Sequence, residues 1–588
     1  MNLIFQEFSA GATQISAEEA FPDLDRDLQQ LAENRDHWVK TSVAERIAIL
    51  AEIKEALWPV SKSWAETAAR KKGIAIGSPL EGEEWISGPY AVMSYCNQMM
   101  TTLSRVSGKH HLDHVPLREL PNGQLAATVL PRSVWDHLLF SGVKVEIWME
   151  PGVNRNNLSQ HTASAYDSTS PDHQKGRVSL VLGAGNIAAI APLDVFHKLF
   201  AENEVVILKM NPVNDYLIEF LQPALKPLID RGFLVIVRGG TEVGQYLCNH
   251  RLVESIHITG AGASHDAIVW GPGDEGRANK AAGTRKNTRA ITSELGAVCP
   301  TIVVPGPWSA ADIAFQAEHV ATQKLHNSGF NCVACQVLVM PRDWGQKFAF
   351  LDALERIMAT SEARALYYPG AKERLAGFAA SNRSTKALRR TGGEDVLIAP
   401  LDVKNNVSAR SVEVFAPALS VTEIDGTDPD SYLRDAIRFV NEQLYGTLGA
   451  NIVVHPATIA RMGRQRFEDL LAELRYGTIA VNAWTGLAFL MPQAPWGAFP
   501  GHDIADVQSG IGVVHNTYLF EKPQRTVVEA PFRPFPRNLL SLSFTLLPRP
   551  PWFVTNRKSR ILGRLLLAFE YRPGFFKIPR IFLNALLG

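Results

Sequence analysis

The sequence predicts an α/β protein with two doubly wound domains, each built on a parallel sheet covered by helices. Short runs of aliphatic and β-branched residues alternate with amphipathic helical stretches twice along the 588-residue chain. The composition, with 46% hydrophobic and 20% charged residues, is typical of a chain with large packed cores. The formal net charge of zero gives no general attraction for nucleic acid, so any charge-dependent binding must be local.

The first hundred residues are expected to form a helical layer. Between about residues 21 and 105, apolar residues recur every three to four positions, as in residues 43–57. The N-terminal segment lacks the basic and apolar regions of a secretory signal, and no apolar run reaches the roughly 18 residues of a membrane span. The five cysteines form no disulfide framework, which favours a reducing compartment such as the cytoplasm.

The first alternation of strands and helices begins at Arg177. Its predicted strands, separated by helical stretches, are residues 178–182, 204–209, 233–237 and 255–258. This order implies a parallel sheet with right-handed crossovers, whose ligands lie beyond the carboxyl ends of the strands. Gly183 and Gly185 follow the first strand, where a dinucleotide would be sought, but the third glycine of the usual fingerprint is missing.

A second alternation follows. Its predicted elements are a strand at 301–304, a helix at 310–324, a strand at 335–340, a helix at 346–360 and a strand at 479–482. We therefore expect a dinucleotide-binding domain, with the N-terminal helices, in residues 1–295 and a second α/β domain in residues 296–485.

Several motifs, in the correct order between about residues 177 and 515, resemble the aldehyde dehydrogenase family. Residues 292–300 (Thr-Ser-Glu-Leu-Gly-Ala-Val-Cys-Pro) resemble its glutamate motif, and residues 327–332 (Asn-Ser-Gly-Phe-Asn-Cys) resemble its cysteine motif. Cys332 follows Glu294 by 38 residues. Less specific matches lie at residues 413–417, 436–441, 445–446, 480–482, 496–497 and 509–512.

The resemblance implies an aldehyde dehydrogenase-like fold and oxidation of an aldehyde to a carboxylic acid with NAD or NADP. Cys332 would be the nucleophile, because a thiolate can make the carbonyl carbon tetrahedral and allow it to expel hydride. Glu294 would activate water to hydrolyse the resulting thioester. Asn186 and the backbone N–H of Cys332 would bind the oxyanion, at about 3–4 kcal/mol per donor.

The asparagine and the cofactor residues follow from the same resemblance. Asn186 precedes Lys209 by the family's interval of 23 residues, although the surrounding motif is rewritten as Ala-Gly-Asn-Ile-Ala. The residues that would hold the cofactor are Lys209, Gly240, Gly244, Gly260, Leu295, Glu413 and Phe415. Pro212 stands where NAD-preferring members often carry a glutamate, so the choice between NAD and NADP is open.

Each of these residues also has a plainer interpretation. Cys332 could be a buried core thiol, or could pair with Cys335 in a redox or metal site, although no second Cys-x-x-Cys accompanies it and no metal site is expected. Glu294 could be a solvated surface residue, and Asn186 could cap a helix. Lys209 and Glu413 could form surface ion pairs.

Two further regions complete the expected organisation. The resemblance implies that residues 108–150 and 486–530 form a small β oligomerisation region of a homodimer or homotetramer. Residues 531–588 form an extension whose last 56 residues, 533–588, contain ten basic residues and one acidic residue between apolar clusters. This pattern suits peripheral contact with an anionic membrane, but the apolar clusters could equally pack on the body or on a neighbouring subunit.

Two rival functions belong to other classes. Residues 184–188 also resemble a segment of fatty-acyl reductases, which run thioester chemistry toward the aldehyde, although Glu294 argues against this direction. The altered asparagine motif and an insertion at residues 261–293 could instead mark a decayed relative that binds nucleotide or membrane without turnover.

Overall fold

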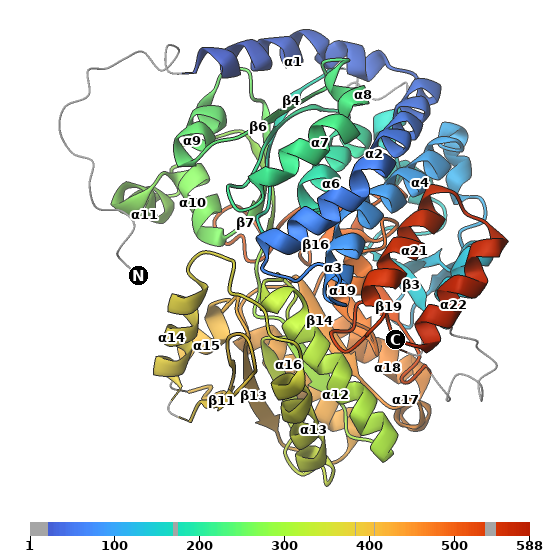
Figure 1. Cartoon of the computed structure of the whole chain (residues 1–588), viewed down its shortest axis with the longest axis vertical. Helices are drawn as coiled ribbons and strands as arrows, with labels where there is room; N and C mark the ends of the chain where they lie inside the picture. Colours follow the sequence, from blue (N-terminus) through green and yellow to red (C-terminus); the bar gives the residue numbers. More distant parts are fainter. Residues whose placement is uncertain (1–20, 168–174, 383, 405, 535–548) are drawn as a thin grey trace.

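The computed structural model describes residues 21–167, 175–382, 384–404, 406–534 and 549–588. Within these residues, the strands form a six-stranded, an eleven-stranded and a two-stranded sheet. Figure 1 shows the two larger sheets one above the other, each with helices packed against it. The expected α/β class with two domains is therefore confirmed.

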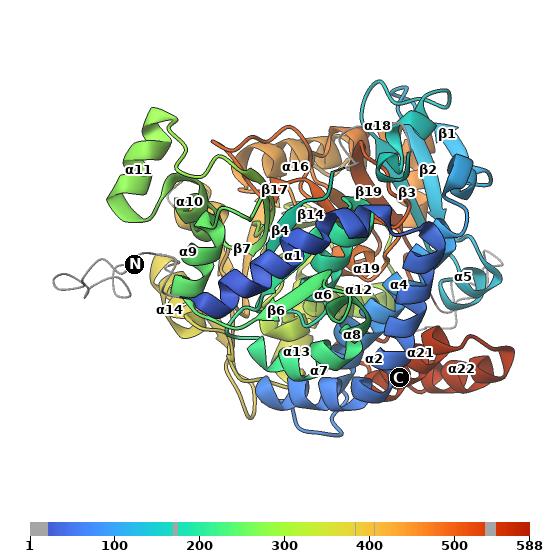
Figure 2. The same cartoon turned by 90° about the horizontal axis from the view of Figure 1, so that it is seen from above.

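Helices cover the N-terminal part, as the apolar periodicity predicts. They are α1 (Pro22–Lys40), α2 (Val43–Lys71), α3 (Glu81–Trp85) and α4 (Ala91–Leu103). Helix α2 begins at a capping box, in which the Ser42 hydroxyl accepts from the Glu45 N–H and the Glu45 carboxylate accepts from the Ser42 N–H. Helix α1 crosses one face of the six-stranded sheet (Figure 2).

The six-stranded sheet has the order β17-β8-β7-β4-β5-β6. Its strands are β4 (Val178–Leu182), β5 (Val205–Lys209), β6 (Leu234–Val237), β7 (Ser255–Gly260), β8 (Ala290–Leu295) and β17 (Gly510–Ile511). All pairs are parallel except β17 with β8. The connecting helices include α6 (Ile190–Phe196) and α9 (Thr241–Asn249). The four strands expected in this region are confirmed, and β8 adds one that carries Glu294.

The eleven-stranded sheet holds the second domain. Its order is β1-β2-β3-β19-β15-β14-β9-β10-β13-β12-β11. The strands of the domain itself are β9 (Pro300–Val303), β10 (Val337–Pro341), β11 (Lys386–Leu388), β12 (Val396–Pro400), β13 (Ala418–Ile424), β14 (Gly449–Val453) and β15 (Thr478–Val481). Its helices include α12 (Ala310–Leu325), α13 (Lys347–Thr360), α14 (Ala371–Ser381) and α19 (Thr485–Phe489).

The expected small β region is continuous with this second sheet. Its strands are β1 (Leu117–Glu119), β2 (Leu125–Leu130), β3 (Lys144–Met149) and β19 (Pro523–Glu529). Strand β19 pairs in parallel with β15 on one side and antiparallel with β3 on the other. The backbone hydrogen bonds of β19 therefore join the two halves into one sheet.

The insertion and the extension both fold as helices. The insertion at residues 261–293 contains α10 (Gly262–Trp270) and α11 (Gly273–Ala282), which lie at the periphery (Figure 2). The extension contains α21 (Ser559–Tyr571) and α22 (Ile578–Leu586), while its first apolar cluster, residues 539–547, lies outside the described residues. Among the helices described, none has the length and apolar character needed to cross a bilayer.

Candidate functional site

The carboxyl ends of β7 and β8 place Glu294 at the edge of the dinucleotide sheet. Thr259 of β7 pairs in register with Glu294 of β8, and Gly260 pairs with Leu295. The Leu295 N–H donates to the Ser509 carbonyl at 2.8 Å, which fixes the end of the strand. Glu294 is 3% exposed, so its interpretation as a solvated surface residue is wrong.

Cys332 lies in a tight loop between α12 and β10. Three successive residues, Asn327, Ser328 and Gly329, have positive φ values of 52°, 56° and 80°. At Gly329 a Cβ would lie 2.8 Å from the Ala416 carbonyl oxygen, so this left-handed turn accepts only glycine at its third position. Among the five free cysteines, Cys332 is partly exposed and the other four are buried. The loop thus holds this thiol at the edge of a hydrophobic core, where it is partly exposed.

The thiol and the carboxylate meet in the interior. The Cys332 thiol lies close enough to the Glu294 carboxylate for each group to shift the pKa of the other, and the Glu294 Oε2 has no hydrogen-bond partner among the described residues. Burial raises the pKa of Glu294 to about 7, and the nearby Asp194 carboxyl contributes to the rise. Burial and the Glu294 charge raise the pKa of Cys332 well above its usual value. The proton therefore rests on sulfur, with a base nearby to receive it.

Asn186 lies against the thiol loop. Its Nδ2 donates to the Phe330 carbonyl at 2.9 Å, two residues before Cys332 in sequence. Helix α6 begins at Ile190, after Ala189, so the interpretation of Asn186 as a helix cap is wrong. A primary amide carries two N–H groups, and the contact with Phe330 uses one of them. One donor of Asn186 is therefore left for a bound group.

Lys209 lies beside the N-terminus of α9. A Cβ at Gly244 would lie 3.6 Å from the Lys209 Cε, and Gly240 precedes the first residue of the helix with open space around its Cα. The Lys209 ammonium is buried, which lowers its pKa, and donates to the Met210 carbonyl at 3.4 Å. Free N–H groups of the first helical turn, a cation and open space suit a phosphate or ribose.

Glu413 and Phe415 approach the same centre from the second domain. Burial raises the pKa of Glu413 to about 8, and its Oε1 has no hydrogen-bond partner among the described residues. The described residues also give neither Glu413 nor Lys209 a salt-bridge partner, so the interpretation of both as surface ion pairs is wrong. Phe415, with φ of 46°, packs its ring 5.7 Å from that of Phe330. An unpartnered buried carboxyl oxygen fits a hydroxyl donor such as a ribose.

Five residues around the thiol loop have no signal in the sequence that points to them: Lys72, Glu83, Glu84, Arg364 and Tyr367. The Lys72 ammonium donates to the Asn186 carbonyl at 3.0 Å and to the Asn327 Oδ1 at 3.2 Å. Lys72, Glu83 and Glu84 come from the N-terminal helical layer. Arg364 and Tyr367 come from the loop before α14. Side chains so distant in sequence meet only in the folded chain, which explains why periodicity and motifs miss them.

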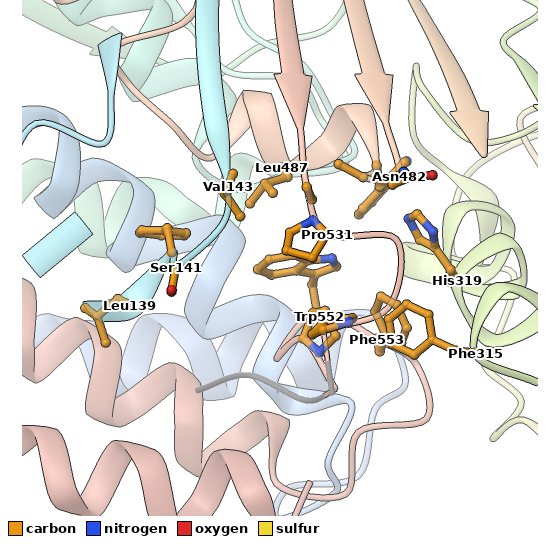
Figure 3. Close-up of a pocket in the computed structure, with 16 residues that line it drawn as sticks. Leu139, Ser141, Val143, Phe315, His319, Asn482, Leu487, Pro531, Trp552 and Phe553 are labelled. Carbon is orange, nitrogen blue, oxygen red and sulfur yellow. The ribbon is translucent and has the colours of Figure 1, made fainter. Parts of the chain in front are cut away.

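Two cavities border the site. An apolar cavity of about 50 Å³ is enclosed by Leu487, Phe315, Trp552 and Phe553, which converge on it in Figure 3. Trp484 also lines this cavity, and its indole donates to the carbonyl of Val333, the residue after Cys332, at 3.3 Å. The second cavity, of about 330 Å³, has among its lining residues Lys72, Tyr367, Asn214 and Pro212, the proline that departs from the family pattern.

Cys332 and Cys335 lie in different surroundings. Cys335 is fully buried, and its N–H donates to the Gln323 carbonyl at 3.0 Å. In the part of the chain that the structure describes, there is no group of three or more His, Cys, Asp or Glu side chains suited to a metal ion.

Comparisons with known proteins identify similar sequences and folds. Residues 188–499, more than half of the chain, match the aldehyde dehydrogenase family. The structure is similar to γ-glutamyl-γ-aminobutyraldehyde dehydrogenase from Burkholderia cenocepacia, with 20% identity, a TM-score of 0.57 and coverage of 86% of this chain and 88% of that one. It is also similar to aldehyde dehydrogenase C from Pseudomonas syringae, solved with NAD⁺ and octanal, with 17% identity, a TM-score of 0.57 and coverage of 87% of this chain and 90% of that one. An aldehyde dehydrogenase from Mycobacterium tuberculosis, solved with NAD⁺, is similar with 16% identity, a TM-score of 0.57 and coverage of 87% of this chain and 90% of that one.

Proposed function

This chain belongs to the aldehyde dehydrogenase family, and we propose that it oxidises an aldehyde to a carboxylic acid with NAD or NADP as the hydride acceptor. One observation carries the proposal. A partly exposed thiol, Cys332, lies beside a buried carboxylate, Glu294, at the carboxyl end of the dinucleotide-type sheet, where each shifts the pKa of the other. A nucleophile, a base and a cofactor edge therefore meet at one point.

In the first step, Glu294 takes the thiol proton as the Cys332 sulfur bonds to the aldehyde carbon. The free N–H of Asn186 and the backbone N–H of Cys332 stabilise the oxyanion that forms on the carbonyl oxygen. The raised pKa of Glu294, about 7, suits this transfer, since the carboxylate is a stronger base than an exposed glutamate and still ionises near neutral pH.

The cofactor, when bound, supplies a carbon that accepts the hydride, and this chain's residues hold it in place. Lys209, Gly240 and Gly244 would hold the adenosine ribose and phosphates, while Glu413 and Phe415 would hold the nicotinamide ribose. Pro212 places no carboxylate near the ribose 2′ position, so a 2′-phosphate meets no charge repulsion there. We therefore expect the enzyme to accept both NAD and NADP.

Before the second step, Glu294 releases the proton that it took from the thiol to solvent. Glu294 then takes a proton from a water molecule, whose oxygen attacks the thioester carbon. The carbon–sulfur bond breaks, the proton returns to sulfur, and a free carboxylic acid leaves. A base at this position favours hydrolysis over acyl transfer to another thiol. A basic-apolar extension that brings the enzyme to a lipid surface favours aldehydes with long aliphatic chains.

A panel of aldehydes from two to sixteen carbons, assayed with NAD and with NADP, tests the proposal. We expect NADH or NADPH formation with equal production of carboxylic acid, and the highest kcat/KM for the longer chains. Acyl-CoA with NADH or NADPH is assayed in parallel as the reductive direction. Faster oxidation of the reduced cofactor with acyl-CoA would favour the reductase, whereas cofactor binding without any turnover would favour a decayed relative.

We further propose that residues 575–587 of the extension contact an anionic membrane surface. The face of α22 that packs inward buries Ile578, Ile581 and Ala585. The outward side carries apolar side chains that are 57–100% exposed: Phe575, Phe576, Leu583, Leu586 and Leu587. Soluble surfaces seldom expose so many large apolar side chains together.

Charge selects the partner of this surface. Phe576, Arg580, Leu583 and Leu587 are spaced by four, three and four residues, so they share one helical face. Arg580 lies among the apolar side chains, and no acidic residue follows Glu570 in the chain. Apolar side chains flanked only by basic ones suit a helix lying in the headgroup region of anionic lipids.

We expect the double variant Leu583→Glu/Leu587→Glu to lose at least about tenfold in affinity for vesicles rich in phosphatidylserine, because two exposed leucines that would enter the headgroup region become negative charges. Sedimentation with vesicles measures the affinity. Phe348→Glu is the matched control, since Phe348 is 71% exposed on another helix, α13. Unchanged pelleting of the double variant would contradict the membrane proposal. A changed oligomeric state of the double variant by light scattering would make this face a subunit contact.

The family also implies a homodimer or homotetramer, which we adopt as a proposal. Light scattering of the purified chain measures its mass.

A further inference from the structure

The short helix α3 lies between the C-terminal extension and the thiol loop. Figure 1 shows α21 beside α3, at the end of the N-terminal helical layer that lies nearest the second domain. Gly82 of α3 contacts α21, whereas the next two residues, Glu83 and Glu84, make buried ion pairs on the side of the thiol loop. A five-residue helix thus connects the extension with the candidate catalytic centre.

Glu83 holds the turn that begins the thiol loop. One of its carboxylate oxygens accepts from the Asn327 N–H at 2.9 Å and from the Arg364 Nη1 at 2.7 Å. The side chains of Glu83 and Arg364 are each 4% exposed. Asn327 has a positive φ of 52°, a conformation that needs support from its surroundings. The carboxylate supplies this support five residues before Cys332.

Glu84 acts through Lys72 on the candidate oxyanion donor. The Lys72 ammonium lies 2.9 Å from the Glu84 Oε1, and both side chains are almost fully buried. The same ammonium donates to the Asn186 carbonyl and to the Asn327 side chain. Tyr367 donates to these two acceptors as well, at 3.1 and 2.9 Å. Two donors thus converge on the peptide that carries the Asn186 amide.

Helix α21 meets α3 at backbone distance. A Cβ at Gly82 would lie 2.2 Å from the Ser559 Oγ and 2.4 Å from its carbonyl carbon. A Cβ at Gly563 would lie 2.8 Å from the Trp85 Cβ. The Arg560 guanidinium pairs at 2.9 Å with Glu81, which is fully buried. No side chain fits between the two helices at these points, so α21 fixes the position of α3.

We propose that the C-terminal extension is a positioning element of the active site, in which α21 holds α3 so that Glu83 and Glu84 fix the thiol-loop turn and the Asn186 peptide. Lys72, Glu83 and Glu84 are positioning residues, since they act through Asn327 and Asn186. The inference rests on the proposed function for the role of Asn186, but the contacts with the thiol loop stand without it.

Gly82→Ala and Gly574→Ala in the full-length protein form a matched pair. The same methyl group meets Ser559 at Gly82 and nothing within 4 Å at Gly574. For Gly82→Ala we expect kcat and the rate of the first turnover to fall by about tenfold to a hundredfold, since small displacements of reacting groups have effects of this size. KM for the cofactor should stay within about twofold, because the α9 site is untouched. Gly574→Ala should behave as the wild type.

A second pair removes the charges without disturbing the helix contact. Lys72→Met/Glu84→Gln leaves no unpaired buried charge, and we expect it to show the same loss in kcat as Gly82→Ala. The single variant Lys72→Arg should retain most of the wild-type activity, because it keeps a cationic donor. Each protein is also treated with iodoacetamide, and its rate of Cys332 alkylation is compared with that of the wild type. Thermal melting gives the folded fraction by which each rate is divided. We expect an altered rate in Gly82→Ala and in the double variant.

Wild-type kcat and alkylation rates in both Gly82→Ala and the double variant would overturn the inference. Loss of folded protein with a normal kcat per reactive thiol would also overturn it, because it would make the contacts merely structural. A wild-type protein that oxidises no aldehyde would defeat the proposed function alone, since the alkylation rates would still report on the position of the thiol loop.

Discussion

Cys332→Ala is expected to lower kcat for aldehyde oxidation by about four orders of magnitude or more, because no other group can form the covalent intermediate. Cofactor binding, measured by fluorescence titration, should change by less than about threefold. The variant tests the step on which the whole proposal depends, and NADH formation measured at high enzyme concentration gives the residual rate.

Cys335→Ala is the matched control for this variant. Cys335 lies three residues further along the chain and is fully buried in the second domain. Its replacement removes a small core side chain and should lower the thermal stability with little change in kcat per folded molecule. If aldehyde oxidation survived in Cys332→Ala and disappeared in Cys335→Ala, the nucleophile would be Cys335, and its assignment to Cys332 would be wrong.

Glu294→Gln is expected to slow steady-state turnover by about a hundredfold to ten-thousandfold, the range that general-base catalysis supplies. If thioester hydrolysis depends on this carboxylate more than the first step does, one equivalent of NADH forms per site and turnover then stalls. Rapid-quench mass spectrometry should detect a protein with an acyl group on Cys332. A steady-state rate within threefold of the wild type would remove Glu294 from the mechanism.

The same residue sets the pH dependence. The pKa of Glu294 is raised from 4.5 to about 7, so the carboxyl is protonated and cannot accept a proton at lower pH. Wild-type turnover should therefore rise tenfold per pH unit below about pH 7 and level off above it. The inflection should be absent from the residual rate of Glu294→Gln, and its persistence there would assign the titration to another group.

The sheets could be predicted from the sequence because parallel strands buried on both faces form apolar runs bounded by turn residues. The expected strand at residues 178–182 coincides with β4, and the expected helix at 310–324 is α12, one residue longer. Strand β8 carries the motif around Glu294 but alternates polar and apolar residues weakly, so it was expected only as a motif. The continuity of β19 with β15 depends on pairing between distant segments, which no local pattern encodes.

The site could be predicted only where a motif carried it. The motifs predict Cys332 and Glu294, and spacing predicts Asn186 and Lys209. Glu294, Asn186 and Lys209 lie at the carboxyl ends of strands or just after them, and Cys332 lies in the loop between α12 and β10. Lys72 follows the end of α2 and Glu84 lies in α3, both within the segment whose apolar periodicity predicts an amphipathic layer, and a buried ion pair leaves no mark on that periodicity. The extension was ambiguous for the same reason, since α21 packs on α3 while α22 leaves its outer face open.

The position of β19 has a consequence for how the chain folds during synthesis. Strand β3, residues 144–149, joins the second domain's sheet only through β19, residues 523–529. The edge of β3 that will pair with β19 therefore stays unpaired until almost four hundred further residues have left the ribosome. An unpaired edge exposed for that time invites pairing with other nascent chains. At about 5–20 residues per second the wait lasts some 20–80 seconds, so the yield of native protein should depend on chaperones that cover this edge.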